Sequence, residues 1–227
     1  MENKQILETL RRKLIVSCQA SSEEPLYSPE SLLSMARAAV EGGAVALRAN
    51  TPLPVRYMKT FFDVPVIGLY KAVYPDSDVY ITPTIKEVDA IAVAGAEIIA
   101  VDATLRKRPN GETLENVLSR IKNRHNLIAM ADISNYDEAI NAVNLGFDII
   151  GTTLSGYTPY STQSDKPDFE LLEKIIKNTK VPVIMEGKIW NPDEMAKAFE
   201  LGAYAVVIGS SITRPQLITK RFHQTVR

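Results

Sequence analysis

The stretch VPVIMEGKIWNPDEMAKAFELGAYAVVIGSS, residues 181–211, contains the features that decide the fold. An apolar run, VPVIM, is followed by a polar loop, a segment of helical period, a glycine and a second apolar run, YAVVIG. Asn191 and Pro192 are typical of a helix start, and Gly202 of a helix end. The stretch therefore predicts a strand, a helix and a second strand parallel to the first.

Similar units recur along the chain. The segments EGGAVALRA, AGAEIIAVDA, LGFDIIGTT and LGAYAVVIGS each place a helix-ending glycine before a short turn and a strand. These glycines, Gly43, Gly95, Gly146 and Gly202, lie 52, 51 and 56 residues apart. The spacing fits two βα units per copy, so four copies give eight strands. We predict an α/β protein, a single (β/α)8 TIM barrel domain over residues 1–227. An open doubly wound sheet is the alternative, but it does not need such regular spacing.

Further helix boundaries are legible in the sequence. Ser28 and Pro29 predict an N-cap followed by a proline in the first turn. Thr84 and Glu87 have the spacing of a capping box. Another helix is expected over residues 136–145. These segments alternate with the apolar runs, as the barrel requires.

Composition excludes several classes of protein. Of the 227 residues, 45% are hydrophobic and 23% charged, and the net charge is −1. This balance gives no electrostatic footprint for nucleic acid or for an anionic membrane. No apolar stretch approaches the roughly 18 residues of a membrane span, and the opening MENKQILETLRRKL lacks the apolar region of a signal peptide. The single cysteine, Cys18, fits a reducing compartment. We expect a cytoplasmic protein that binds neither nucleic acid nor membrane.

Polar residues follow the apolar runs, where parallel strands end. In a barrel these ends converge on one face, which carries the active site. The residues concerned are Gln19, Arg48, Lys71, Asp102, Asp132, Thr152, Thr153, Glu186, Ser210 and Ser211. Together they predict a pocket for a polyhydroxylated anion, with acid–base groups inside it.

Lys71 and Glu186 are the candidate catalytic residues. Burial lowers the pKa of a lysine, so Lys71 could act as a base or as a Schiff-base nucleophile; a lysine that only extends to solvent at the rim is the alternative. Glu186 could act as an acid or base, or accept a hydrogen bond from substrate. It could also form a salt bridge with Lys71 or Arg48.

The remaining strand-end residues are candidates for substrate binding. Arg48 suits an oxygen-rich ligand, and Gln19 suits hydroxyl or amide groups, although either could be an interstrand brace. Asp132 and Thr153 are predicted to contact substrate as well. Asp102 receives no role, because a carboxylate there can also orient a neighbouring loop. Cys18 is interpreted as a small buried hydrophobic residue.

The end of the chain predicts a phosphate site. TIM barrels often bind phosphate with the loops after the last two strands and the start of a short helix. The residues at those places are Gly187, Gly209, Ser210, Ser211 and Arg214. Neither a P-loop nor a dinucleotide fingerprint is found. The two histidines, His125 and His223, lie away from the strand ends, so we expect no metal site.

From LIVSCQA through GGAVALRAN, PVIGLYK, ADIS and GTTLSGYT to VIMEGKIWNPDEMAKAFELGAYAVVIGSSITRP, the chain resembles the N-acylmannosamine-6-phosphate 2-epimerases of bacterial sialic acid catabolism. The resemblance implies a cofactor-free TIM barrel that inverts C2 of N-acetylmannosamine 6-phosphate. It implies a catalytic lysine at Lys71 and a glutamate near the N-acyl group at Glu186. The family's substrate-contacting glutamine, arginine and aspartate match Gln19, Arg48 and Asp132. One departure is the bulky aromatic residue before the lysine, Tyr70, which would narrow the pocket.

Two other functions stay open on the sequence. Lys71 could form a Schiff base in an aldolase-like lyase, or the barrel could bind a sugar phosphate without turnover. A homodimer is expected, because small barrels of this type often pair. Acetyl versus glycolyl preference, the number of bases and the direction of flux are not fixed by the sequence.

Overall fold

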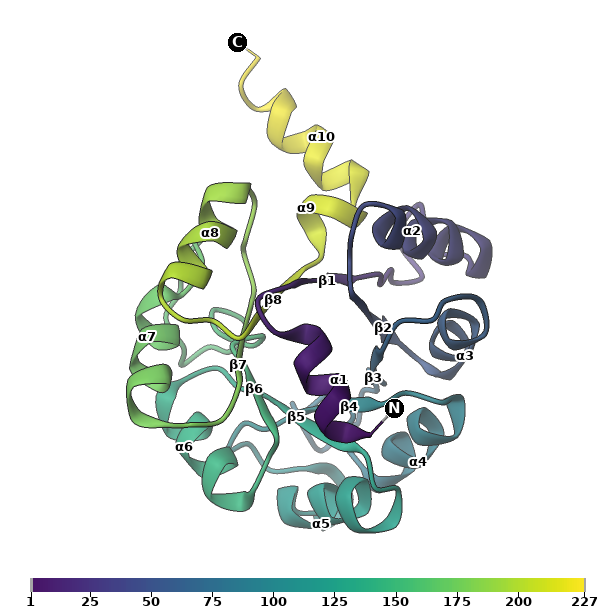
Figure 1. Cartoon of the computed structure of the whole chain (residues 1–227). Helices are drawn as coiled ribbons and strands as arrows, with labels where there is room; N and C mark the ends of the chain where they lie inside the picture. Colours follow the sequence, from purple (N-terminus) through teal and green to yellow (C-terminus); the bar gives the residue numbers. More distant parts are fainter. Residues whose placement is uncertain (1, 227) are drawn as a thin grey trace.

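The computed structural model describes residues 2–226, which form a closed barrel of parallel strands surrounded by helices (Figure 1). Each strand pairs in parallel with the next along the chain, and β8 closes the barrel on β1 through the register Leu14↔Val206. The (β/α)8 prediction is therefore confirmed, and the open sheet is wrong. The strands are β1 (Leu14–Ser17), β2 (Ala46–Asn50), β3 (Val66–Leu69), β4 (Ile98–Asp102), β5 (Ile128–Asp132), β6 (Ile149–Gly151), β7 (Val183–Glu186) and β8 (Ala205–Ile208).

The helices form the outer layer and the two chain ends. They are α1 (Asn3–Leu10), α2 (Pro29–Glu41), α3 (Pro52–Phe61), α4 (Ile85–Ala94), η1 (Pro109–Gly111), α5 (Leu114–Ser119), η2 (Arg120–Arg124), α6 (Tyr136–Leu145), α7 (Phe169–Asn178), α8 (Pro192–Glu200), α9 (Ser210–Thr213) and α10 (Pro215–His223). Here η1 is a 3₁₀ turn, and η2 is a π-helical turn that continues α5.

The predicted helix boundaries are confirmed. Ser28 caps α2 by accepting a hydrogen bond from the Ser31 N–H, and Thr84 and Glu87 form the capping box of α4. The four repeat glycines all have φ between 95° and 101°, a left-handed conformation that residues with a Cβ rarely adopt. The repeat in the sequence thus marks the point where each of four helices turns into its strand.

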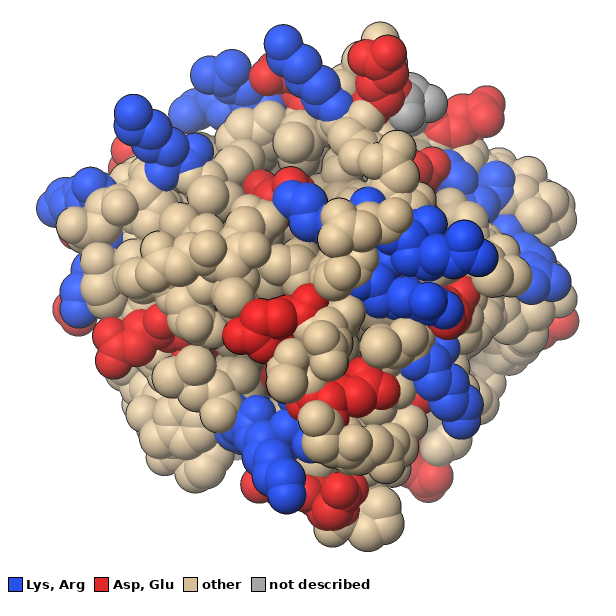
Figure 2. Space-filling view, turned by 90° about the horizontal axis from the view of Figure 1, so that it is seen from below, with Lys and Arg blue, Asp and Glu red and all other residues tan. Residues whose placement is uncertain are grey.

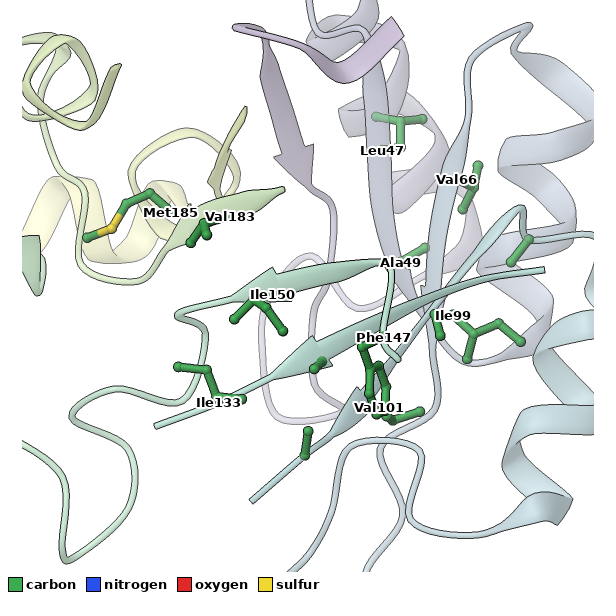
Figure 3. Close-up of a cluster of buried hydrophobic side chains, with 14 of the residues drawn as sticks. Leu47, Ala49, Val66, Ile99, Val101, Ile133, Phe147, Ile150, Val183 and Met185 are labelled. Atoms are coloured by element: carbon green, nitrogen blue, oxygen red, sulfur yellow. The ribbon is translucent and has the colours of Figure 1, made fainter. Parts of the chain in front are cut away.

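The strands separate two apolar cores because successive side chains point to opposite faces. Figure 3 shows outward-facing strand residues such as Leu47, Ile99 and Met185, which pack toward the helices. Their neighbours Ile98 and Ile184 point inward and belong to the barrel interior. Both faces of every strand are thus apolar near its start, which accounts for the continuous apolar runs.

Toward the carboxyl ends the inward-facing positions become polar. On β2 the inward residues are Ala46 and then Arg48, and on β5 they are Met130 and then Asp132. On β7, Ile184 is followed by Glu186. The alternation of the strands therefore delivers these polar side chains to the inside of the barrel, at one end.

The opposite end of the barrel is closed by α1. Its residues Ile6 and Leu10 are buried in the interior core, and Figure 1 shows the helix lying across the barrel. At the other terminus, α10 extends away from the barrel and has no buried residue among those described.

The side of the molecule in Figure 2 carries acidic and basic side chains in a mixed distribution. Among the described residues, the helices are too short or too polar to cross a bilayer.

Candidate functional site

A cavity of about 230 Å³ opens at the carboxyl ends of the strands. Most of the predicted site residues line it: Gln19, Arg48, Lys71, Thr153, Glu186, Gly187, Gly209, Ser210 and Arg214. Asp132 lies directly behind this wall, in contact with Arg48 and Thr153. Ser211 lies in the first turn of the short helix beside it. The fold thus gathers residues from both halves of the chain into one pocket.

Arg48 is the centre of a buried ion cluster at the pocket floor. Its Nη2 lies 2.6 Å from Asp132 Oδ2, and its Nη1 lies 3.0 Å from Glu186 Oε2. The arginine side chain is only 1% exposed. Arg48 therefore acts as an interstrand brace, which the sequence analysis gave as the alternative to substrate binding. It holds two carboxylates from different strands in place.

Asp132 is held on two sides. The Thr153 hydroxyl is 2.6 Å from Asp132 Oδ1, and Arg48 binds both carboxylate oxygens, the second at 3.2 Å. Thr153 also lies 3.2 Å from Glu186 Oε2. A Cβ on inward-facing Gly151 would lie 2.4 Å from Met130 Cε and 3.2 Å from Asp132 Oδ1, so a side chain there would displace the end of Met130 and press on the Asp132 carboxylate. Direct substrate contact by Asp132 stays a prediction.

Glu186 has the most perturbed carboxyl group in the pocket. Loss of water on burial raises its pKa to about 7, against the opposing attraction of Arg48, while Asp132 adds repulsion. Of the two salt bridges expected for Glu186, the structure contains the one with Arg48. A carboxyl group that titrates near neutral pH can change its protonation state during a reaction.

Lys71 follows β3, and its backbone N–H donates a 2.8 Å hydrogen bond to Asn50 Oδ1. It lines the cavity, although the residue keeps exposed surface. Loss of water lowers the pKa of its amine, and the positive charges of Arg48 and Arg214 lower it further. The environment therefore favours the neutral amine, as the sequence predicted.

Tyr70 does not narrow the pocket, contrary to the expectation from the sequence. It packs with the outer core between strands and helices, whereas Leu69 and Lys71 face the interior side. The reason is the alternation of side chains along the extended segment.

The first strand contributes a pair of polar groups. Gln19 Nε2 donates a 2.9 Å hydrogen bond to Ser17 Oγ, while Gln19 Oε1 is enclosed without a hydrogen-bond donor among the described residues. An unpaired buried acceptor is costly, so a ligand N–H or O–H would be favourable here. Ser17 was missed by the sequence reasoning, although it lies two residues before Gln19 on the same face.

The predicted phosphate residues lie together at the ends of β7 and β8. Gly209 precedes α9, a single turn of helix that begins at Ser210. Ser211 donates its hydroxyl to the Ile189 carbonyl at 2.8 Å, so its side chain is occupied. Arg214 Nε lies 2.9 Å from Glu24 Oε1, which holds the guanidinium beside the pocket and balances part of its charge. Gly187 has φ 112°, which brings the backbone of this loop to the cavity.

Several residues of the pocket come from loops and had no signal in the sequence. Tyr80 lies in the loop between β3 and α4, and Tyr157 in the loop between β6 and α7. Lys188 and Trp190 follow Glu186 in the next loop. The Lys188 amine lies 5.1 Å from the centre of the Tyr157 ring and 3.4 Å from the Gly156 carbonyl oxygen. Strand periodicity gives no information on such loop positions.

The structure also locates the residues to which the sequence analysis assigned no role in the pocket. Asp102 binds Arg106 at 2.7 Å and Thr104 at 2.7 Å, so it orients the loop after β4. Cys18 is fully buried, and burial raises the pKa of its thiol to about 12. His125 lies 2.7 Å from Asp89 on the outer surface. Among residues 2–226, no group of three His, Cys, Asp or Glu side chains has the arrangement of a metal site.

Comparison with known proteins gives consistent matches. A family described as "Putative N-acetylmannosamine-6-phosphate epimerase" matches residues 32–227. The chain is 52% identical over 217 residues to a "Putative N-acetylmannosamine-6-phosphate 2-epimerase" of Clostridium perfringens, covering 96% of this chain and 98% of that one. A protein of the same description in Clostridioides difficile is 50% identical over 221 residues, covering 97% and 99%.

Solved structures give the same result. The N-acetylmannosamine-6-phosphate 2-epimerase from Clostridium perfringens superposes with a TM-score of 0.95 at 50% identity, covering 97% of this chain and 96% of that one. A thiamine phosphate pyrophosphorylase from Pyrococcus furiosus superposes with a TM-score of 0.61 at 18% identity, covering 95% and 93%. The second match shows a shared barrel fold and nothing about activity.

Proposed function

Because the chain belongs to the N-acetylmannosamine-6-phosphate epimerase family, we propose that it is an isomerase that inverts C2 of N-acetylmannosamine 6-phosphate to give N-acetylglucosamine 6-phosphate. The observation that carries the proposal is the pocket itself. It joins a lysine of lowered pKa, Lys71, to a buried arginine–carboxylate cluster and to the loops after β7 and β8.

The chemistry needs a base at C2. The C2 proton becomes acidic only when C1 is an open-chain aldehyde, because the electron pair can then move onto the carbonyl oxygen. Lys71 as a neutral amine removes this proton, and C2 is reprotonated to give the other configuration. Its lowered pKa increases the fraction of the amine that is neutral at physiological pH.

Glu186 holds the substrate next to that base. In its ionised form the carboxylate accepts a hydrogen bond from the N–H of the acylamino group, which is attached to C2. The Arg48 bridge fixes the direction of this carboxylate, and Gln19 Oε1 offers an acceptor to a sugar hydroxyl group. The Thr153 hydroxyl contacts the carboxylates of both Asp132 and Glu186 and so holds them in place.

The phosphate group anchors the other end of the substrate. The backbone of Gly187, Gly209 and Ser210 and the side chain of Arg214 surround the place where it binds. Binding energy gained there orients the reacting carbon at Lys71. In this arrangement the phosphate lies on the β7–β8 side, and C1 and C2 lie toward the middle of the pocket.

We further propose a cellular setting for the protein. The relatives named above are bacterial, so this is taken to be a bacterial, cytoplasmic enzyme of sialic acid catabolism. It works without metal, cofactor or nucleic acid. A homodimer would cover the apolar side chain of Phe222 on α10, which is 73% exposed.

The test is incubation with N-acetylmannosamine 6-phosphate while the configuration at C2 is followed by proton NMR. In D2O the product should carry deuterium at C2; product without deuterium would exclude exchange of this proton with solvent. Lys71→Ala should lose at least about 100-fold in kcat, as removal of a general base typically does. Trapping of substrate on Lys71 by borohydride, without epimerisation, would instead indicate a Schiff-base lyase.

A further inference from the structure

The proposed epimerisation has one requirement that is met by none of the residues given a role above. Any residue assigned to it has that role only if the proposed function is correct. When the C2 proton moves to Lys71, negative charge develops on the C1 oxygen. A hydrogen-bond donor aimed at that oxygen is usually among the largest contributions to such a reaction. The pocket should therefore contain a donor that is not already used.

Most donors of the pocket are already engaged. Both terminal nitrogens of Arg48 bind carboxylates, and its buried Nε, which has no hydrogen-bond partner among the described residues, belongs to a side chain that is only 1% exposed. The Thr153 hydroxyl lies 2.6 Å from Asp132 Oδ1, the distance of a hydrogen bond that this carboxylate accepts. Arg214 is paired with Glu24. The terminal nitrogens of Arg48, the Thr153 hydroxyl, and Nε and Nη2 of Arg214 thus already have partners in the protein.

The other donors near β8 lie on the side of the cavity where the phosphate is proposed to bind. Ser210 begins α9, and Gln19 is bonded to Ser17, whose Cβ lies 3.4 Å from the Cβ position of Gly209. Lys188 binds the carbonyls of Gly156 and Ser164. Ser210 and Lys188 lie on the β7–β8 side of the cavity, where the phosphate is proposed to bind, whereas C1 is at the far end of the six-carbon chain.

Tyr80 is the donor on the opposite side of the barrel. The segment after β3 folds back on itself, so that Ala72 N–H donates to the Tyr80 carbonyl at 3.0 Å and Lys71 bridges with Ile81. This pairing holds the tyrosine beside the catalytic lysine. The charges that act most on its phenol are those of Asp132 and Asp102, which end β5 and β4. In a closed eight-stranded barrel, β4 lies across from β8.

The Tyr80 hydroxyl makes no hydrogen bond to any of residues 2–226. The second phenol in the cavity wall, Tyr157, is placed differently. Its ring lies 4.0 Å from the Cβ position of Gly187 and 5.1 Å from the Lys188 amine, so it belongs to the phosphate end. The two tyrosines thus come from different loops and line different parts of the cavity wall.

We propose that the Tyr80 hydroxyl donates a hydrogen bond to the C1 oxygen and stabilises the enolate formed during epimerisation. In this step the C2–H bond breaks and its proton goes to Lys71 Nζ. Its electron pair forms the C1–C2 double bond, and the carbonyl π pair moves to the C1 oxygen, which the phenol O–H faces. Reprotonation of C2 reverses these movements.

The environment keeps the phenol in the form that this role needs. Loss of water raises the pKa of Tyr80 to about 12, and the negative charges of Asp132 and Asp102 contribute to this rise. The hydroxyl therefore keeps its hydrogen over the whole pH range in which the lysine and the glutamate titrate. A donor that does not ionise cannot be lost as the pH rises.

The first experiment is Tyr80→Phe, which removes the hydroxyl and keeps the ring. We expect kcat to fall about 100-fold, with KM changed less than about threefold and an unchanged Tm. Tyr70→Phe is the matched control, because Tyr70 is in the same segment but packs on the outer core. A Tyr80→Phe kcat within about threefold of the parent protein would overturn the proposal, and so would a rise in KM with kcat unchanged.

A second experiment measures binding without turnover. Two ligands are compared by calorimetry: the C1 alcohol of the open-chain substrate, and the C1 carboxylate, whose oxygen carries the charge of the enolate. Tyr80→Phe should weaken the carboxylate about tenfold or more and leave the alcohol within about twofold. Equal effects on both ligands would overturn the proposal. If the parent protein fails to epimerise, the proposed function fails by itself, and this binding comparison still decides whether the Tyr80 hydroxyl interacts with a charged oxygen at C1.

Discussion

Replacing Arg48 by methionine should destabilise the protein in a way that depends on pH. The guanidinium is buried between two carboxylates, with 2.6 Å to Asp132 Oδ2 and 3.0 Å to Glu186 Oε2. Methionine fills a similar volume but leaves both carboxylates without their cation. Removing one partner of a buried ion pair typically costs about 3–5 kcal/mol in the free energy of unfolding.

The sign of the pH dependence is set by Glu186. Its pKa is about 7 in the folded protein, and the attraction of Arg48 keeps it from being higher. Below pH 7 this carboxyl group is protonated with or without Arg48. Above pH 7 the parent protein releases the proton, whereas folded Arg48→Met keeps it and the unfolded chain does not. The unfolding free energy of Arg48→Met therefore falls by about 1.4 kcal/mol per pH unit relative to the parent protein. This fall continues until the pH reaches the raised pKa of Glu186 in the folded variant.

Urea denaturation followed by circular dichroism at pH 6.0 and pH 8.5 tests this reasoning. We expect a loss of about 3 kcal/mol at the lower pH and about 2 kcal/mol more at the higher one. In Arg48→Met/Glu186→Gln the additional loss should disappear. Arg11→Met, which removes a surface pair with Glu8, should cost less than about 0.5 kcal/mol at either pH. An equal loss of stability at both pH values would refute the reasoning, because it would show that Arg48 does not stabilise the protein through the ionisation of Glu186.

Other parts of the structure give three further predictions. In the proposed mechanism Glu186 must ionise to accept the substrate N–H, and its pKa is about 7, so kcat/KM should rise through about pH 7; Glu186→Gln should lack this rise in a pH–rate profile. Arg214→Met should raise KM about tenfold, as expected for loss of a hydrogen bond to a charged group; a kcat more than about threefold lower would contradict a role limited to phosphate. Gly68→Ala should cost about 1–3 kcal/mol by overpacking, because its Cβ would lie 2.5 Å from Ile91 Cγ2 and 2.8 Å from Ala96 Cβ. Urea denaturation checks this, and an unchanged midpoint would show that α4 moves freely.

Much of the fold was predictable because its signals are local. A strand buried on both faces reads as an apolar run, and a helix that ends at a left-handed residue reads as a glycine. The fifty-residue repeat of such glycines indicated four double units, and Gly95 and Gly146 do end α4 and α6. The strand-end rule likewise placed Lys71, Glu186 and Ser210 at one pocket.

Local signals did not distinguish residues that face the cavity from residues that lie behind it. Asp102, Asp132 and Glu186 all end apolar runs, yet Glu186 lines the cavity, Asp132 lies behind Arg48, and Asp102 holds a loop. The difference comes from partners that are distant in sequence, such as Arg48 and Asp132, which are 84 residues apart. Nothing in the sequence pattern records such a pairing.

By itself, then, the sequence determined the barrel, the face that carries the site and most of the residues that reach it, because strand period and helix ends are properties of a few neighbouring residues. The tertiary structure alone decided the charge state of the site and its loop residues. The pKa of Glu186 depends on burial and on Arg48 and Asp132, which come from other strands. Tyr80 reaches the pocket because its loop folds back and pairs with residues 70–72, just after β3. Electrostatic interactions act through space, so they depend on distances that only the closed barrel sets.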